Sequence, residues 1–88
     1  MDNRIIEMLL LVYEINKMGG ELVFELRRDE FSIHDTKKGC ENIIANTDLG
    51  QDGKRSVYFE EWFKDSYEEC VDTYLKVLNE MKEELNND

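Results

Sequence analysis

Apolar residues recur at steps of three and four along the first part of the chain, and this spacing predicts an amphipathic helix. The helix is expected over about residues 3–18, because Asp2 or Asn3 can cap its start and Gly19-Gly20 can end it. Its apolar face is wider than one small sheet covers, so we expect a second contact, either with the last helix or with another copy of the protein. The residues of this face are Ile5, Ile6, Met8, Leu9, Leu10, Val12, Tyr13 and Ile15.

The same helical spacing returns at the end of the chain and predicts a long last helix. Ser66 and Glu69 have the spacing of a capping box, and residues 86–87 are expected to end the helix. Trp62 and Phe63 either extend the preceding strand or form a hydrophobic staple and a first turn. The apolar positions of this helix are Tyr67, Cys70, Val71, Tyr74, Val77, Leu78, Met81 and Leu85.

Between the two helices, apolar and polar residues alternate with a period of two, which is typical of strands with one solvated face. The four strands are expected at residues 21–27, 31–35, 41–47 and 55–59. The first two predict an antiparallel hairpin that turns at Asp29-Glu30. The last two predict a second hairpin around Asp52-Gly53, because glycine accepts the positive φ that tight turns require.

These elements together predict one α+β domain over residues 1–88. An N-terminal helix, an antiparallel sheet of three to four strands in two hairpins, and a long C-terminal helix follow one another, and both helices are expected on one face of the sheet. Hydrophobic residues make up 41% of the chain, which is enough for one core in a domain of this size.

Cysteine usage and the N-terminal segment indicate a cytoplasmic protein. Cys40 and Cys70 are too few and too far apart for a secreted disulfide scaffold, so we expect two reduced, partly buried thiols, although spacing alone leaves a disulfide open. The apolar run at residues 8–13 is shorter than a secretory signal or a membrane span requires.

The net charge of −10 narrows the class of partner. Residues 59–88 hold ten acidic and three basic side chains, so most of the negative charge belongs to the last third of the chain. Nucleic acids and anionic membranes are themselves negative, and direct binding to either is therefore not expected. A protein with a basic surface is the favoured partner.

No catalytic, cofactor or metal motif is recognisable. Residues 48–59 resemble a calcium loop, but Gly50 and Phe59 stand where two acidic ligands are required. His34 is expected on a solvated strand face, and Cys70 on the apolar side of a helix, where a thiol is inert. We therefore expect a non-enzymatic protein without a cofactor or metal.

The acidic face of the last helix is the candidate partner-binding site, although a solvated face that only confers solubility would have the same composition. The candidate residues are Glu60, Glu61, Asp65, Glu68, Glu69, Asp72, Glu80 and Glu83. In size, charge and expected architecture the chain resembles the small acidic phage-encoded inhibitors that imitate nucleic acid, such as anti-CRISPR proteins. This resemblance implies an inhibitor whose carboxylates occupy a basic, nucleic-acid-binding groove of a partner. Lys64, Lys76 and Lys82 interrupt the acidic run and depart from a close duplex mimic.

A homodimeric interaction module that pairs through the apolar face of the first helix is the alternative. A larger exposed acidic patch in the fold would favour binding of a basic partner, and a larger exposed apolar patch would favour the homodimer.

Overall fold

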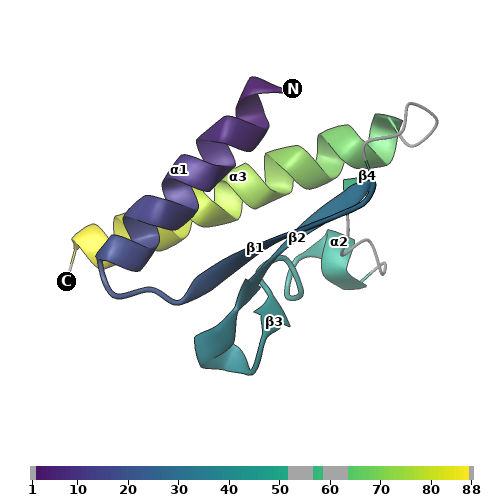
Figure 1. Cartoon of the computed structure of the whole chain (residues 1–88). Helices are drawn as coiled ribbons and strands as arrows, with labels where there is room; N and C mark the ends of the chain where they lie inside the picture. Colours follow the sequence, from purple (N-terminus) through teal and green to yellow (C-terminus); the bar gives the residue numbers. More distant parts are fainter. Residues whose placement is uncertain (1, 52–56, 59–63, 88) are drawn as a thin grey trace.

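Two long helices lie on one face of an antiparallel sheet in the computed structural model (Figure 1). The structure describes residues 2–51, 57–58 and 64–87, and side chains within 2–51 and 67–87. The elements are α1 (Asn3–Lys17), β1 (Leu22–Arg27), β2 (Glu30–Asp35), the 3-10 helix η1 (Thr36–Lys38), β3 (Glu41–Asn42), α2 (Asp48–Gln51), β4 (Val57–Tyr58) and α3 (Lys64–Asn86). The predicted α+β class and the order of its main elements are confirmed.

The first helix, α1, begins and ends where the sequence predicts. The Asp2 side chain caps it by accepting a hydrogen bond from the Arg4 backbone nitrogen at 2.9 Å. Gly19, at a φ of +100°, ends it in a conformation that other residues rarely adopt. One side of the helix enters the core through Ile5, Met8, Leu11, Val12 and Ile15.

The hairpin of β1 and β2 has the predicted alternation. Phe24 pairs with Ile33 and Leu26 with Phe31, which places these residues on the face toward the helices. Phe31 and Ile33 are fully buried there, whereas Leu26 is 62% exposed near the turn. The chain turns at residues 28–29, one position earlier than expected.

The predicted second hairpin is wrong, because β3 and β4 each pair with β2. Since β1 occupies one edge of β2, both short strands share the other edge and make one interrupted third strand. Residues 43–46 form turns, although an extended strand was expected through residue 47. The Asn42 side chain accepts from the Ile44 nitrogen at 3.0 Å and the Thr47 hydroxyl donates to the Ile44 carbonyl at 2.6 Å, so side chains take over the bonds that a strand would make.

The helical turn α2 occupies the start of the segment between residues 47 and 55, which we expected to be the turn of the second hairpin. It packs so closely on the preceding turn that a side chain at Gly50 would place its Cβ 2.3 Å from the Ile44 carbonyl oxygen. Glycine is therefore required for this approach. The predicted turn at Asp52-Gly53 lies outside the described residues.

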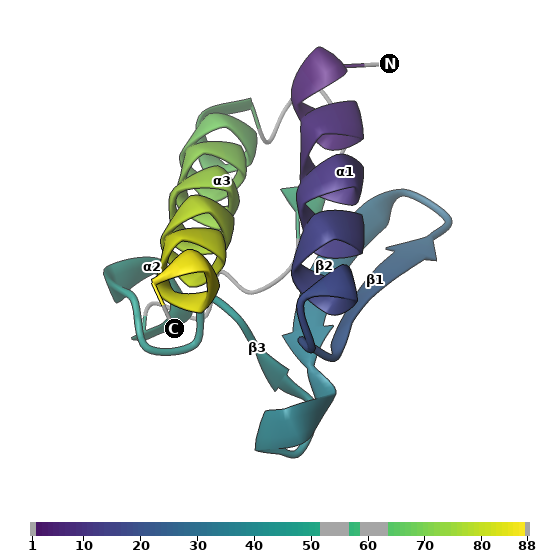
Figure 2. The ribbon, with the colours of Figure 1, turned by 90° about the vertical axis from the view of Figure 1, so that its left-hand side faces the viewer.

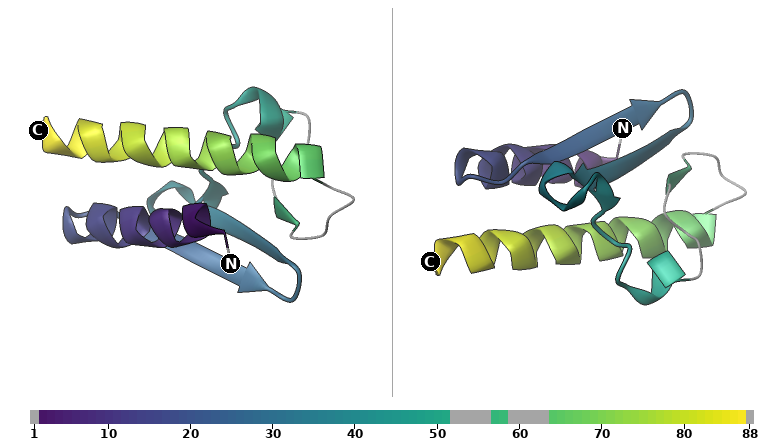
Figure 3. Two further views of the ribbon diagram at one scale, coloured as in Figure 1. Left: turned by 90° about the horizontal axis from the view of Figure 1, so that it is seen from above. Right: turned by 90° about the horizontal axis from the view of Figure 1, so that it is seen from below.

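The last helix, α3, runs parallel to α1 and beside it (Figure 2). It begins at Lys64, two residues before the expected start, so Ser66 lies inside the helix. The predicted capping box depends on the Ser66 side chain, which lies outside the described side chains. Val71, Tyr74 and Leu78 are fully buried between α1 and the sheet. Views from above and below show the sheet on one side of the helix pair (Figure 3).

Candidate partner-binding surfaces

The structure describes the side chains of Glu68, Glu69, Asp72, Glu80 and Glu83 among the predicted site residues, all on α3. Glu60 and Glu61 lie outside the described residues. Asp65 belongs to α3, but its side chain lies outside the described side chains. The five described carboxylates fall into two groups with different surroundings.

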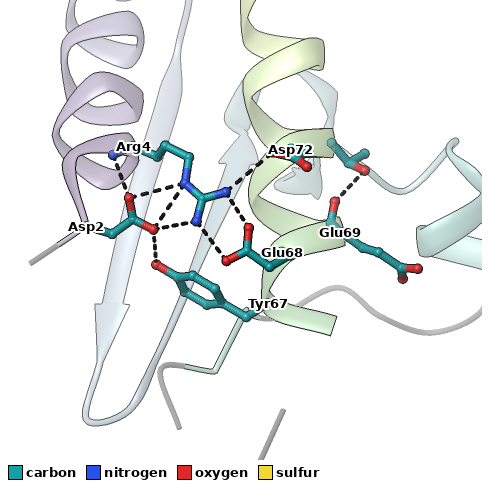
Figure 4. Close-up of polar contacts among 7 residues, drawn as sticks. Asp2, Arg4, Tyr67, Glu68, Glu69 and Asp72 are labelled. Carbon is teal, nitrogen blue, oxygen red and sulfur yellow. Dashed lines mark hydrogen bonds and ion pairs between the residues drawn. The ribbon is translucent and has the colours of Figure 1, made fainter. Parts of the chain in front are cut away.

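Near the start of α3, Arg4 draws acidic side chains into a cluster with α1 (Figure 4). Its guanidinium donates to the two Glu68 carboxylate oxygens at 2.7 and 3.0 Å, and to Asp2 at 2.7 Å. Asp72 lies at the edge of this cluster, 3.5 Å from the Arg4 Nη1. The Tyr67 hydroxyl donates to Asp2 at 2.9 Å. Glu68 therefore has an intramolecular partner, whereas a solvated side chain was expected.

The protonation equilibria of this cluster reflect these contacts. Hydrogen bonds from the Arg4 side chain, and then from its backbone nitrogen, hold the pKa of Asp2 well below its usual range. The pKa of Arg4 is raised, mainly by the hydrogen bond to Glu68 and to a smaller extent by the hydrogen bond to Asp2. Burial, together with the hydrogen bond to Asp2, raises the pKa of Tyr67 to about 12. Asp2 and Arg4 thus stay charged and Tyr67 keeps its proton over a wide pH range, and the cluster joins α1 to α3.

A second ion pair joins the same two helices near their C-terminal ends. The Lys82 ammonium contacts the Glu14 carboxylate of α1. Lys82 thus points toward α1, although in the sequence it interrupts the acidic run. Because Arg4 meets Glu68 at one end and Glu14 meets Lys82 at the other, the two ion pairs fix the parallel arrangement of the helices.

The second group of carboxylates lies on the outer side of α3. Glu80, Glu83 and Glu84 are exposed, and their carboxylates make no hydrogen bond or ion pair within the described part of the chain. Glu69 and Lys76 are also exposed farther along the helix toward its start. The negative charge open to a partner is therefore concentrated in the last two turns of α3.

In the part of the chain that the structure describes, two grooves run along α3. The α2–α3 groove, of about 510 Å³, is lined by Asp48 of α2 and by Glu69, Asp72, Lys76 and Glu80 of α3, among other residues. The β3–α3 groove, of about 590 Å³, lies between the second half of α3, β3 and the end of α1. Glu80 lines both grooves.

Five carboxylates that line these grooves were not among the predicted site residues: Glu21, Asp35, Glu41, Asp48 and Glu84. Glu84 was available in the sequence as a neighbour of Glu83. Asp48 is brought to α3 by the α2 turn, which no local pattern indicated.

The predicted wide apolar face of α1 is divided between the core and the surface. Ile5 and Val12 are buried, and they belong to the face that packs on the sheet and on α3. The residues on the outer side form an exposed apolar stripe at helical spacing: Ile6, Leu9, Leu10 and Tyr13, with exposed fractions of 47, 43, 58 and 61%. The Lys17 ammonium lies 5.4 Å from the Tyr13 ring and extends this stripe.

The predicted solvated face of the sheet carries His34. Its Nε2 lies 2.8 Å from the Ser32 hydroxyl, and its Nδ1 lies 3.2 Å from the Cys40 carbonyl oxygen. These contacts hold the imidazole against the strand from which it comes. Both cysteines are free thiols, but Cys40 is exposed rather than partly buried, whereas Cys70 is buried as expected.

Among the residues that the structure describes, no three His, Cys, Asp or Glu side chains are grouped so that they could share a metal ion. In the same part of the chain, no helix has both the length and the apolar character needed to span a bilayer. Comparison with protein-family models, with curated proteins and with solved structures gave no match.

Proposed function

We propose that this chain is a non-enzymatic, cytoplasmic binding protein whose acidic surface occupies a basic surface of a partner protein. The observation that carries this proposal is the group of exposed carboxylates in the second half of α3, Glu80, Glu83 and Glu84, which have no partner in the described part of the chain. The net charge of −10 adds long-range attraction toward a cationic partner.

The partner class favoured by this surface is a nucleic-acid-binding enzyme. Carboxylate oxygens accept hydrogen bonds from arginine as phosphate oxygens do, so a helix that displays them can compete for the same basic groove. Binding there would inhibit the enzyme by excluding its nucleic acid. Because Arg4 engages Glu68, the contact residues are expected toward Glu80 and Glu83 rather than near the start of α3.

The proposal is tested with two variants that change the net charge equally. Glu80→Lys with Glu83→Lys reverses the proposed contact, and Glu7→Lys with Asp29→Lys reverses two exposed acids outside α3. A partner retained from cell lysate by the immobilised wild type is purified, and its association rate is measured over a salt series. The α3 variant is expected to associate about tenfold more slowly at low salt, because surface charges mainly steer the encounter.

A partner that binds both variants equally well would contradict the proposed surface. Competition supplies the second measurement: if the chain imitates nucleic acid, a DNA or RNA duplex bound by the partner must be displaced. Simultaneous binding of the duplex and the chain would exclude inhibition by mimicry.

A second candidate function, homodimerisation through α1, is favoured by the exposed apolar stripe. Two copies of α1 packed antiparallel about a two-fold axis would set Ile6 against Tyr13 and Leu9 against Leu10 of the other copy. The same pairing would bring Lys17 toward the acidic N-cap, Asp2, of the second copy. This self-complementarity supports a second copy of the chain as the partner for the stripe.

A further inference from the structure

The β3–α3 groove combines accessible apolar side chains with the proposed binding surface. Ile43, Val77, Met81 and Leu85 line it and are half-buried, so each packs against the core and still presents apolar atoms to the groove. Val77, Met81 and Leu85 follow one another at intervals of four and form a continuous row along α3. The volume of about 590 Å³ is in the range of sites that bind small ligands.

The charges that line the same groove are mainly negative. The exposed or half-buried ones are Glu21, Glu41, Glu80, Glu84, Lys37 and Lys38. The Lys37 ammonium donates to the Gly19 carbonyl at the end of α1, so one of the two cations already has a partner. Glu80 and Glu84 stand one turn apart beside the apolar row and have no partner among the described residues.

We infer that the β3–α3 groove binds a peptide segment of a partner protein in which aliphatic side chains are flanked by lysine or arginine. Aliphatic side chains would cover Val77, Met81 and Leu85, and the flanking cations would meet Glu80 and Glu84. Met81 suits such a role, because its flexible side chain adapts to different apolar partners. This inference rests on the proposed function and names the part of the partner that the acidic surface takes up.

Charge complementarity distinguishes this occupant from others. A purely apolar segment would leave the carboxylates beside it without a counter-charge, and an anionic ligand such as a fatty acid would meet repulsion from Glu80 and Glu84. A basic segment without aliphatic side chains would leave the apolar row uncovered.

The experiment selects binders from a library of random twelve-residue peptides displayed on phage, with the whole chain as bait. Enriched peptides are expected to combine aliphatic residues with lysine or arginine and to lack acids. Affinities of the synthesised peptides are then measured for three variants of the chain. Glu84→Lys and Leu85→Ser alter the groove, whereas Glu7→Lys makes the same charge change at an exposed position on α1, outside the lining of either groove.

Glu84→Lys and Leu85→Ser are each expected to weaken binding about tenfold, and Glu7→Lys at most about twofold. Amide chemical shifts should change at residues 77–85 and 41–43 when peptide is added. A loss from Glu84→Lys with none from Leu85→Ser would overturn the groove and leave the acidic surface in place. Enriched peptides without basic residues would overturn both the peptide-binding groove and the proposed acidic surface. A selection that enriches no peptide would overturn the groove as a peptide-binding site. Circular dichroism verifies that each variant is folded.

Discussion

The Arg4 guanidinium and the Glu68 carboxylate face each other as two matched forks, joined by hydrogen bonds of 2.7 and 3.0 Å across a sequence separation of 64 residues. The pair fastens the first turn of α1 to the beginning of α3. It also removes one carboxylate from the surface that a basic partner could use. Part of the helix face that the sequence predicts to be solvated therefore holds two helices together.

Replacing Arg4 by lysine is expected to lower the free energy of unfolding by about 0.5–1 kcal/mol, because an ammonium cannot bind both Glu68 oxygens and Asp2 together. The modest size follows from exposure, since 29% of the Arg4 side chain and 47% of the Glu68 side chain are accessible. Urea denaturation gives the value. Arg28→Lys, at an exposed position in the hairpin turn, is the matched control and should change nothing measurable.

Stability should fall at acidic pH in a way that depends on Asp2. Its pKa is lowered in the folded state, so its contribution is present above the unfolded-state pKa of about 4 and is lost as the pH falls below that value. Asp2→Asn keeps a helix cap but loses the charge. The wild type should therefore be more stable than Asp2→Asn at pH 7, and this difference should shrink from pH 5 to pH 2 in thermal melts. A difference independent of pH would contradict the assignment.

Gly50→Ala tests the close approach of α2 to the preceding turn. Helix propensity alone would favour alanine by up to about 1 kcal/mol. The added Cβ would lie 2.3 Å from the Ile44 carbonyl and 2.5 Å from the Ala45 carbonyl, so we expect a loss of about 1–3 kcal/mol instead. Gln51→Ala, at an exposed position in the same turn, controls for propensity. Stabilisation by Gly50→Ala would show that α2 does not pack as described.

Tyr74 joins α3 to the end of β3 inside the core. Its hydroxyl donates to the Asn42 side-chain oxygen at 3.0 Å, and burial raises its pKa to about 12. Tyr74→Phe should cost about 1 kcal/mol, because the Asn42 oxygen still accepts from the Ile44 nitrogen. Tyr74→Ala should cost about 3 kcal/mol or more, because it also opens a cavity. Tyr13→Phe, at an exposed ring, should leave urea midpoints unchanged.

Light scattering at about 100 μM should report twice the 10.5 kDa chain mass if α1 pairs with a second copy. Leu10→Ser with Tyr13→Ser should return the mass to that of one chain without unfolding it, since both side chains are more than half exposed. Leu26→Ser removes an equally exposed leucine outside α1 and should leave the dimer intact. A single-chain mass for the wild type would exclude the dimer.

Local patterns were sufficient to predict α1, α3 and the first hairpin. Their apolar residues recur at steps of three and four in the helices and at every second position in the strands. Ile43 and Ile44 misled the prediction, since an apolar pair in a turn has the same composition as one in a strand. The turn is stabilised by the Asn42 side chain and the Thr47 hydroxyl, because both form hydrogen bonds with the Ile44 backbone. A polar side chain that competes for backbone bonds leaves little trace in a hydrophobic pattern.

Contacts between distant segments were beyond a local pattern for a different reason. The pairing of Phe31 with Val57 depends on which strand edge remains open after the hairpin has formed. The partner of Glu68 comes from the opposite end of the chain, and only the parallel packing of α1 on α3 brings Arg4 to it. The exposed carboxylates Glu80 and Glu83, by contrast, were correctly expected on a polar helix face.

The parallel arrangement of α1 and α3 has an electrical consequence. In an antiparallel helix pair the two macrodipoles cancel, whereas here they add, so the negative ends of both helices coincide. Glu80, Glu83 and Glu84 lie near that same end, and no base occupies the last turn of α3. The molecule is thus a permanent electric dipole, which a cationic surface would rotate into an end-on approach before any side chain makes contact.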